Sequence, residues 1–393
     1  MKNRLALLFS LMVAAALILS ACGPAATVAP TAAPATAAPT EAPEPTAEPT
    51  VTDIGTAAHP IKVLFVPSVD ANVIVTSGQV MADALTEATG LAFEVTVPTS
   101  YAATIEEMCA SPTDTIAFIP ALGYAIASQL CGVDVGFKAV RFGYPVYWAQ
   151  ILVHRDSDIL TLADLEGKTW GYGDAGSTSG YMVPLVMLQE AGITVGEEVQ
   201  TGGHNQSALA VYNGEVDFAT TFYSVPLDPD GAPVFTYDEY LAGVTSDGVE
   251  IAYYDTAAAL AGTLNQDIYE IPAENIPNCA PNEDASRLFC DGFRVLDARA
   301  NIRTEAPDVV QSVRILAVSP AIPNDTMSFG PDFPADLRAQ IEEALLAFAQ
   351  TDAWETTLGS ADFYGWSGII PATDADYDFV RAMVEATGYT LPE

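Results

Sequence analysis

Basic side chains are scarce in this sequence. It contains 14 Lys and Arg residues against 51 Asp and Glu, which gives a formal net charge of -37. Charge of this sign repels the phosphate backbone of nucleic acids and the anionic surface of membranes, so neither is an expected partner. It also repels small anions at long range. Any anion-binding site in this chain must therefore depend on short, directed hydrogen bonds.

Metal-ligating residues are also few. The three histidines, His59, His154 and His204, are scattered along the chain, and no cysteine spacing matches a zinc knuckle. The segment 228–231 (DPDG) has some features of a calcium loop. It lacks the third ligand and the closing Glu at the right offset, so we interpret it as a turn. We therefore expect neither a metal site nor a cofactor.

A long apolar run occurs only at the beginning of the chain. Lys2 and Arg4 precede the apolar residues 5–19, and residues 19–22 (LSAC) end in Cys22. This arrangement resembles the signal peptide and lipobox of bacterial lipoproteins, which implies cleavage before Cys22 and acyl chains on that cysteine. The resemblance implies an extracytoplasmic protein held on the cell membrane by its lipid. A simple secretory signal with a chance cysteine is the alternative.

Large apolar residues are nearly absent from residues 23–58, which are rich in Ala, Pro and Thr with a few Glu. A segment of this composition cannot bury a core and stays disordered. Pro-rich chain extends by about 3 Å per residue, so this tether reaches on the order of 100 Å. We expect it to hold a folded body away from the membrane.

Four cysteines remain if Cys22 carries lipid, namely Cys109, Cys131, Cys279 and Cys290. An even number in an exported protein indicates two disulfides. Three pairings are possible, and the spacing along the chain favours joining the first two and the last two.

Beyond the tether, strand patterns alternate with helix patterns, which is typical of an α/β protein. A body of this length usually divides into two lobes. We expect each lobe to have a mixed or parallel sheet flanked by helices. Lobe 1 comprises residues 59–150 and 320–393 and begins as a parallel, doubly wound sheet. Lobe 2 then comprises residues 151–319, and hinge crossovers near residues 151–154 and 317–321 join the lobes. The expected strands are 61–66, 91–97, 115–119, 146–153, 168–172 and 216–221, and the expected helices are 73–89, 101–110, 121–130 and 206–212.

The segment 173–180 (GDAGSTSG) lies between a strand pattern and an apolar segment that contains Pro184. Proline is tolerated only in the first turn of a helix, so the helix starts in this loop and leaves its first amides free. Free amides, the positive end of the helix dipole and the hydroxyls of Ser177, Thr178 and Ser179 could hold an oxyanion. An ordinary Ser or Thr N-cap is the alternative.

A second corner of the same kind follows at residues 202–205 (GGHN), just before the predicted helix 206–212. In open α/β sheets, ligands bind at the carboxyl ends of strands, so both corners should face one crevice. The second corner supplies His204, which is either a ligand-binding group or a structural histidine.

Together these motifs resemble the phosphate, phosphite and phosphonate substrate-binding proteins of ABC transporters, a family with the type II periplasmic-binding-protein fold. The resemblance extends from residue 61 to the end with one interruption. It implies two α/β lobes that close on an oxyanion, which Ser177, Thr178, Ser179 and His204 bind from lobe 2. The matching segments are 174–184 (DAGSTSGYMVP), 202–217 (GGHNQSALAVYNGEVD), 313–325 (VRILAVSPAIPND) and 374–385 (DADYDFVRAMVE).

The resemblance also implies that Tyr101 and Tyr147 donate hydroxyl hydrogen bonds from lobe 1. Members that bind an aminoalkylphosphonate place acids around the amine. Asp325 fits one such position, but the other position holds Ser224. A further departure is an insertion at about 225–310, which we interpret as a surface subdomain stapled by Cys279 and Cys290; a lid or docking surface is the alternative.

The leading hypothesis is therefore a monomeric, lipid-anchored binding protein. It captures phosphonate, phosphite or phosphate and delivers it to the permease subunits of an ABC importer, without catalysis. A ligand sensor for a membrane receptor is an alternative. An enzyme with Ser177 or Thr178 as nucleophile and His204 as base is another, but no acid is placed to orient His204 and the loop lacks a strained elbow spacing.

Overall fold

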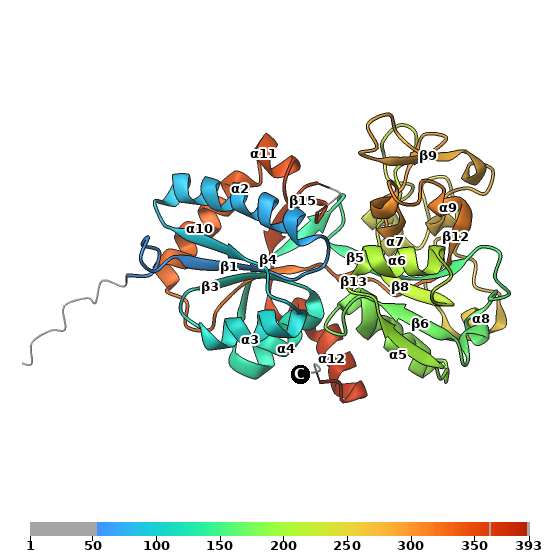
Figure 1. The fold of residues 1–393 in the computed structure, drawn as a ribbon, viewed down its shortest axis with the longest axis horizontal. Coiled ribbons are helices and arrows are strands. Elements are labelled where there is room, and N and C mark those ends of the chain that lie inside the picture. The colour runs from blue at the N-terminus through green and yellow to red at the C-terminus, as the bar shows by residue number, and fades with distance from the viewer. Residues whose placement is uncertain (1–52, 361–362, 391–393) are drawn as a thin grey trace, which may run out of the picture. The chain divides into compact units, whose positions relative to one another are not determined.

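The computed structural model describes residues 53–360 and 363–390, and these residues contain two sheets flanked by helices (Figure 1). None of the helices in these two ranges is long and apolar enough to cross a membrane. Cys22 and the tether up to residue 52 lie outside the described residues. The expected α/β fold class is confirmed.

The first sheet has six strands and is mixed, which is one of the two arrangements that we expected. β1 pairs with β2 and β3 in parallel, but β14 and β15 run antiparallel to their neighbours. β14 differs because the chain returns to it directly from the second sheet, without the helical crossover that parallel pairing needs. The spatial order is β15 (Trp366–Pro371), β4 (Asp134–Arg141), β14 (Thr326–Phe329), β3 (Thr115–Ile119), β1 (Ile61–Phe65) and β2 (Phe93–Thr96).

Helices cover both faces of this sheet. α2 (Ala71–Thr89) and α10 (Ala335–Phe348) lie on one face, and α3 (Tyr101–Ala110) and α4 (Ala121–Cys131) lie on the other (Figure 1). The ends of α2 and α3 agree with the expected helix ranges: Gly90 ends α2 in the left-handed conformation, and the Ser100 hydroxyl accepts a hydrogen bond from the Ala103 amide at the start of α3. α11 (Asp352–Glu355) is a short helix between α10 and β15.

The second sheet is also mixed, with β5 antiparallel to β8 and β12 while β6 is parallel to β7 and β8. α5 (Val183–Glu190) packs on one face with Ile151 and Phe218, and α6 (His204–Tyr212) packs on the other with Leu152 and Ala219. The spatial order is β12 (Val313–Val318), β5 (Val146–His154), β8 (Phe218–Tyr223), β6 (Thr169–Tyr172) and β7 (Glu197–Gln200), with β13 (Ile322–Pro323) also paired to β5.

Two segments carry the chain between the sheets. The first is the turn between β4 and β5, where Phe142 has φ 48° and Gly143 has φ 90°. This turn lies earlier in the chain than the crossover expected at residues 151–154. The reason is that the apolar residues from Val146 onward all belong to β5, a strand of the second sheet. The second segment links β12 to β14 through β13, next to the expected position. The C-terminal helix α12 (Asp378–Thr387), which follows the short helix η6 (Asp374–Tyr377), shares a hydrophobic cluster with α4 and α5.

The insertion after β8 forms its own small elements around the second sheet. Asp228 accepts hydrogen bonds from the amides of Asp230 and Ala232, both at 2.9 Å, so the DPDG segment is a turn as interpreted. The buried Arg299 bonds Asp297 and Glu270 and donates to the Val313 carbonyl, which fastens the insertion to β12. Its elements are α7 (Tyr237–Ala242), α8 (Thr256–Ala261), η3 (Asp267–Tyr269), η4 (Ile276–Asn278), β9 (Cys279–Pro281), β10 (Leu288–Cys290), β11 (Phe293–Arg294), η5 (Ala298–Ile302) and α9 (Val309–Ser312).

The structure contains both disulfides in the favoured pairing. Cys109–Cys131 joins α3 to α4 with 5.7 Å between the Cα atoms. Cys279–Cys290 joins β9 to β10 inside the insertion. The pairing predicted from chain spacing is therefore confirmed.

Candidate functional site

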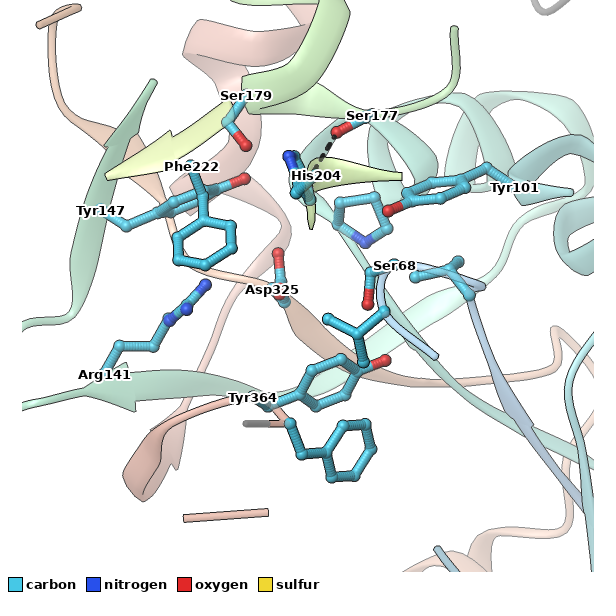
Figure 2. Close-up of a pocket in the computed structure, with 14 residues that line it drawn as sticks. Ser68, Tyr101, Arg141, Tyr147, Ser177, Ser179, His204, Phe222, Asp325 and Tyr364 are labelled. Atoms are coloured by element: carbon cyan, nitrogen blue, oxygen red, sulfur yellow. Dashed lines mark hydrogen bonds between the residues drawn. The ribbon is translucent and has the colours of Figure 1, made fainter. Parts of the chain in front are cut away.

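A small cavity of about 30 Å³ lies among residues contributed by both sheets and by the segments between them. One water needs roughly 10–15 Å³ on this scale, so the cavity has room for a group of few heavy atoms. Figure 2 shows the labelled side chains around the carboxylate of Asp325. The polar lining consists of Ser68, Tyr101, Arg141, Tyr147, Ser177, Ser179, His204, Asp325 and Tyr364.

Four helices begin at this cavity. Tyr101 is the first residue of α3, Pro120 directly precedes α4, and His204 is the first residue of α6. Ser177 precedes the π-helical turn η2 (Thr178–Met182), which continues into α5. Each helix start carries about half a positive charge and several free amides. The cavity is therefore biased toward an anion without help from the net charge of the chain.

The first predicted corner is both an N-cap and part of the cavity wall. The Ser177 hydroxyl oxygen accepts a hydrogen bond from the Gly180 amide at 3.1 Å, so the N-cap interpretation is confirmed. Its proton stays available for another acceptor. Ser179 is 2% exposed and lines the cavity, whereas Thr178 does not line it. The Thr178 hydroxyl instead accepts from the Leu122 amide at 2.8 Å and so ties the corner to α4.

The two corners meet through glycines. The Gly202 amide donates to the Gly173 carbonyl at 3.2 Å. A Cβ on Gly173 would lie 2.8 Å from the backbone of Gly203, so no larger residue fits without displacing one corner. This contact places His204 next to Ser177, with 3.5 Å between Nε2 and Oγ. The prediction that both corners face one crevice is confirmed.

His204 is a neutral group in this site. Burial, together with the neighbouring charge of Arg141, lowers its pKa to about 4. Its Nδ1 is buried without a hydrogen-bond partner in the described part of the chain. A catalytic base would need an orienting acceptor at that nitrogen and a pKa nearer neutrality, so the geometry does not favour nucleophilic catalysis by Ser177.

The tyrosines stay protonated and can act as donors. Burial raises the pKa of Tyr101, Tyr147 and Tyr364 above the usual value, and the charge of Asp325 adds to the effect. Tyr101 comes from α3, as the resemblance implied. Tyr147 does not come from the first lobe as expected. It lies at the beginning of β5, because that strand pairs with β8 of the second sheet from Trp148 onward.

Arg141 is the functional residue that the sequence analysis missed. It ends β4 with 9% of its surface exposed, and its guanidinium carbon lies 4.8 Å from the ring centroid of Phe222 and 5.7 Å from that of Tyr147. Its buried Nε has no hydrogen-bond partner among the described residues. Burial lowers the pKa of Arg141, but the guanidinium stays charged. The cavity lining therefore includes a basic side chain, although the chain as a whole has a formal net charge of -37.

Asp325 lies on the link between β13 and β14, at the position that the family motif predicted. Burial raises its pKa to about 6, although the charge of Arg141 acts in the opposite direction. The neighbouring Asn324 is fully buried and donates to the carbonyls of Ala139 at 2.9 Å and Tyr144 at 2.8 Å. These two bonds hold the segment that carries Asp325 against the strand end that carries Arg141.

Of the residues expected at the ligand, six line the cavity and Thr178 does not. The six are Tyr101, Tyr147, Ser177, Ser179, His204 and Asp325. Ser68, Phe222 and Tyr364 also line it, and no motif in the sequence singled them out. Ser224 does not line the cavity, so Asp325 is the single acidic side chain of the lining in the described residues.

Comparisons with known proteins identify the family that this chain matches and several relatives. Residues 63–377 match a family described as "ABC transporter, phosphonate, periplasmic substrate-binding protein". The chain is 29% identical over 318 residues to the phosphate-import protein PhnD of Mycolicibacterium smegmatis, covering 77% of this chain and 78% of that protein. It is 41% identical over 85 residues to the phosphonates-binding periplasmic protein of Escherichia coli; that match covers only 20% of this chain and 25% of the relative's length.

Solved structures share the fold. A binding protein component of an ABC phosphonate transporter from Pseudomonas aeruginosa superposes with a TM-score of 0.56 at 16% identity, covering 82% of this chain and 85% of that chain. PhnD1 from Prochlorococcus marinus, solved in complex with methylphosphonate, gives 0.56 at 13% identity, covering 84% and 98%. The shared fold is that of type II periplasmic binding proteins, as the sequence resemblance implied.

Proposed function

Because the chain belongs to the family of periplasmic substrate-binding proteins of phosphonate ABC transporters, we propose that it captures one small phosphorus oxyanion and delivers it to the permease of an importer. The ligand is a phosphonate, phosphite or phosphate. The family binds its ligands without catalysis.

The convergence of donors on one small cavity carries this proposal. Four helix starts, the hydroxyls of Ser177 and Ser179, three phenols and the Arg141 guanidinium face the same space of about 30 Å³. The unprotonated oxygens of a phosphorus oxyanion are all hydrogen-bond acceptors. Such a ligand can therefore accept hydrogen bonds from all of these donors together. An uncharged sugar or an amino acid would leave most of them unpaired, at a cost of about 1–3 kcal/mol for each buried group.

Each cavity residue has a role in the proposal. Ser177, Ser179, Tyr101 and Tyr147 donate hydroxyl hydrogen bonds to the oxyanion, and neutral His204 donates through one ring nitrogen. Thr178 acts through its bond to the Leu122 amide, which holds α4 against the first corner. The predicted division into two lobes gives the permease a closed shape to recognise, through motion at the two segments between the sheets.

The N-terminal part of the proposal concerns attachment. The lipobox motif supports acylation of Cys22, and the Ala-, Pro- and Thr-rich composition of residues 23–52 supports a disordered tether. The last part of the expected tether, residues 53–58, belongs instead to the folded body, where the Gly55 carbonyl accepts a hydrogen bond from the Ala92 amide at 2.8 Å. A monomer on such a tether can reach a permease in the same membrane.

A matched pair of serine variants tests the function. In Ser179→Ala, the lost hydroxyl should weaken binding of the best phosphorus ligand by roughly ten- to a hundredfold, because a hydrogen bond to a charged group contributes about 1.5–3 kcal/mol. Ser157 is the control, since its hydroxyl is buried without a partner in the described residues and does not line the cavity. Ser157→Ala should bind like the wild type. Equal binding by both variants would refute the placement of the ligand.

A further inference from the structure

We infer that Arg141, which lines the same cavity as Asp325, makes the site select phosphorus oxyanions that carry no cationic substituent. On this inference, which rests on the proposed function, phosphate, phosphite and simple alkylphosphonates are ligands and aminoalkylphosphonates are rejected. Arg141 is then a specificity-determining residue, and its guanidinium stands where a ligand ammonium would otherwise reach the acid.

The position of Arg141 is built into the fold. The residue ends a strand that pairs with β15 at Trp366, and the turn that follows is closed by two backbone hydrogen bonds between Arg141 and Tyr144, at 2.8 and 2.9 Å. The rings of Phe222 and Tyr147 lie against the guanidinium. The strand and the turn thus fix the backbone of Arg141 in the first sheet, and two rings of the second sheet cover its guanidinium.

The acid is held beside the cation by the same structure. Asn324 bonds the carbonyls of Ala139 and Tyr144, two and three residues to either side of Arg141, and Asp325 is the next residue along the chain. The hydroxyl of Tyr377, the last residue of η6, donates to the Asn324 carbonyl at 3.0 Å and so also holds the segment that carries Asp325. Figure 2 shows Arg141 extending toward Asp325.

The charges then decide which substituents fit. Asp325 is the only acidic lining residue within the described ranges, and its nearest cationic partner is already part of the protein. An ammonium group entering the cavity would find no second carboxylate among the described lining residues and would meet Arg141. Like charges brought together in a buried site repel each other strongly, whereas a neutral alkyl group of the same shape avoids this repulsion.

The test uses two ligands of the same shape, ethylphosphonate and aminomethylphosphonate. Both are titrated into the purified protein at a pH where the two phosphonate groups carry equal charge and the amine is protonated. The wild type should bind ethylphosphonate at least about tenfold more tightly. Arg141→Met should reduce this ratio by about tenfold or more, since Asp325 becomes free to pair with the amine, and Arg141→Lys should retain it.

Each outcome decides the inference. Binding of aminomethylphosphonate within about threefold of ethylphosphonate by the wild type overturns it. Equal rejection of both ligands, with phosphate still bound, also overturns it, because size rather than charge then selects. The inference is also overturned if Arg141→Met prefers ethylphosphonate over aminomethylphosphonate by the same ratio as the wild type. If the folded wild type binds no phosphorus oxyanion at all, the proposed function fails first, and this result is distinct from the other three.

Discussion

Replacing Asp325 with asparagine should stabilise the ligand-free protein at pH 7 and change its stability much less near pH 4. The ordinary pKa of an aspartate carboxyl, 3.8, applies to the unfolded chain, and burial raises the pKa of Asp325 to about 6 in the fold, against the opposing charge of Arg141. Below pH 3.8 both states hold the proton. As the pH rises toward 6 the unfolded state loses its proton first, so the folded state loses stability across that window.

The magnitude follows from the shift. About two pKa units at 1.36 kcal/mol each give a ceiling of about 3 kcal/mol, which asparagine recovers because it carries no charge. For a folded part of about 340 residues, unfolding entropy near 2.1 cal/mol/K per residue converts this ceiling to about 4 °C in Tm. The expected signature is a Tm difference between variant and wild type that grows between pH 4 and pH 7.

Thermal unfolding followed by circular dichroism over this pH range measures the difference. Asp376→Asn is the matched control, for which the change in stability should have the opposite sign. Burial acts to raise the pKa of Asp376, but the hydrogen bonds from Lys138 and from the Thr373 amide lower it below the ordinary value. Its removal should destabilise the protein at pH 7, with a loss that shrinks as the pH falls toward 3. A Tm difference for Asp325→Asn that is independent of pH would refute the reasoning.

Three further predictions concern the corner, the disulfides and the anchor. Gly173→Ala should weaken phosphate binding by about tenfold or more, because its Cβ would lie 2.8 Å from the Gly203 backbone; Gly368→Ala, with nothing within 4 Å, should bind normally in the same titration. Cys279→Ser together with Cys290→Ser should lower the free energy of unfolding by about 3 kcal/mol in denaturant titrations, and an unchanged midpoint would contradict the disulfide's contribution. Cys22→Ser should release the protein from the membrane fraction; continued retention there would contradict the anchor.

Local signals in the sequence predicted much of the fold. Gly90 and Ser100 mark helix ends at the positions where the structure has them, since a left-handed residue and a side-chain cap depend on a few neighbouring atoms only. Pro184 placed the start of α5 for the same reason. Strand direction was harder. Nothing within residues 326–329 reveals that β14 enters the first sheet directly from the second, which reverses its direction.

The cavity residues that stand in local sequence motifs could be predicted, whereas those that depend on contacts made only in the folded protein could not. Ser177 and His204 stand in corner motifs that family resemblance and glycine spacing both indicate. Arg141 is one of only 14 basic residues in the chain, but no local motif around it indicates a site. Its meaning depends on Phe222 and Asp325, which are distant in sequence and meet it only in the folded protein.

Calorimetric titration of the purified, ligand-free wild type with phosphate, phosphite and methylphosphonate, with sulfate as a control, tests the central claim most directly. Donors from four helix starts, three phenols and Arg141 converge on the cavity. We therefore predict one-to-one binding of at least one of the three phosphorus ligands, with a Kd in the micromolar range or tighter. The absence of binding heat for all three at several temperatures, in protein that circular dichroism shows to be folded, would contradict the account.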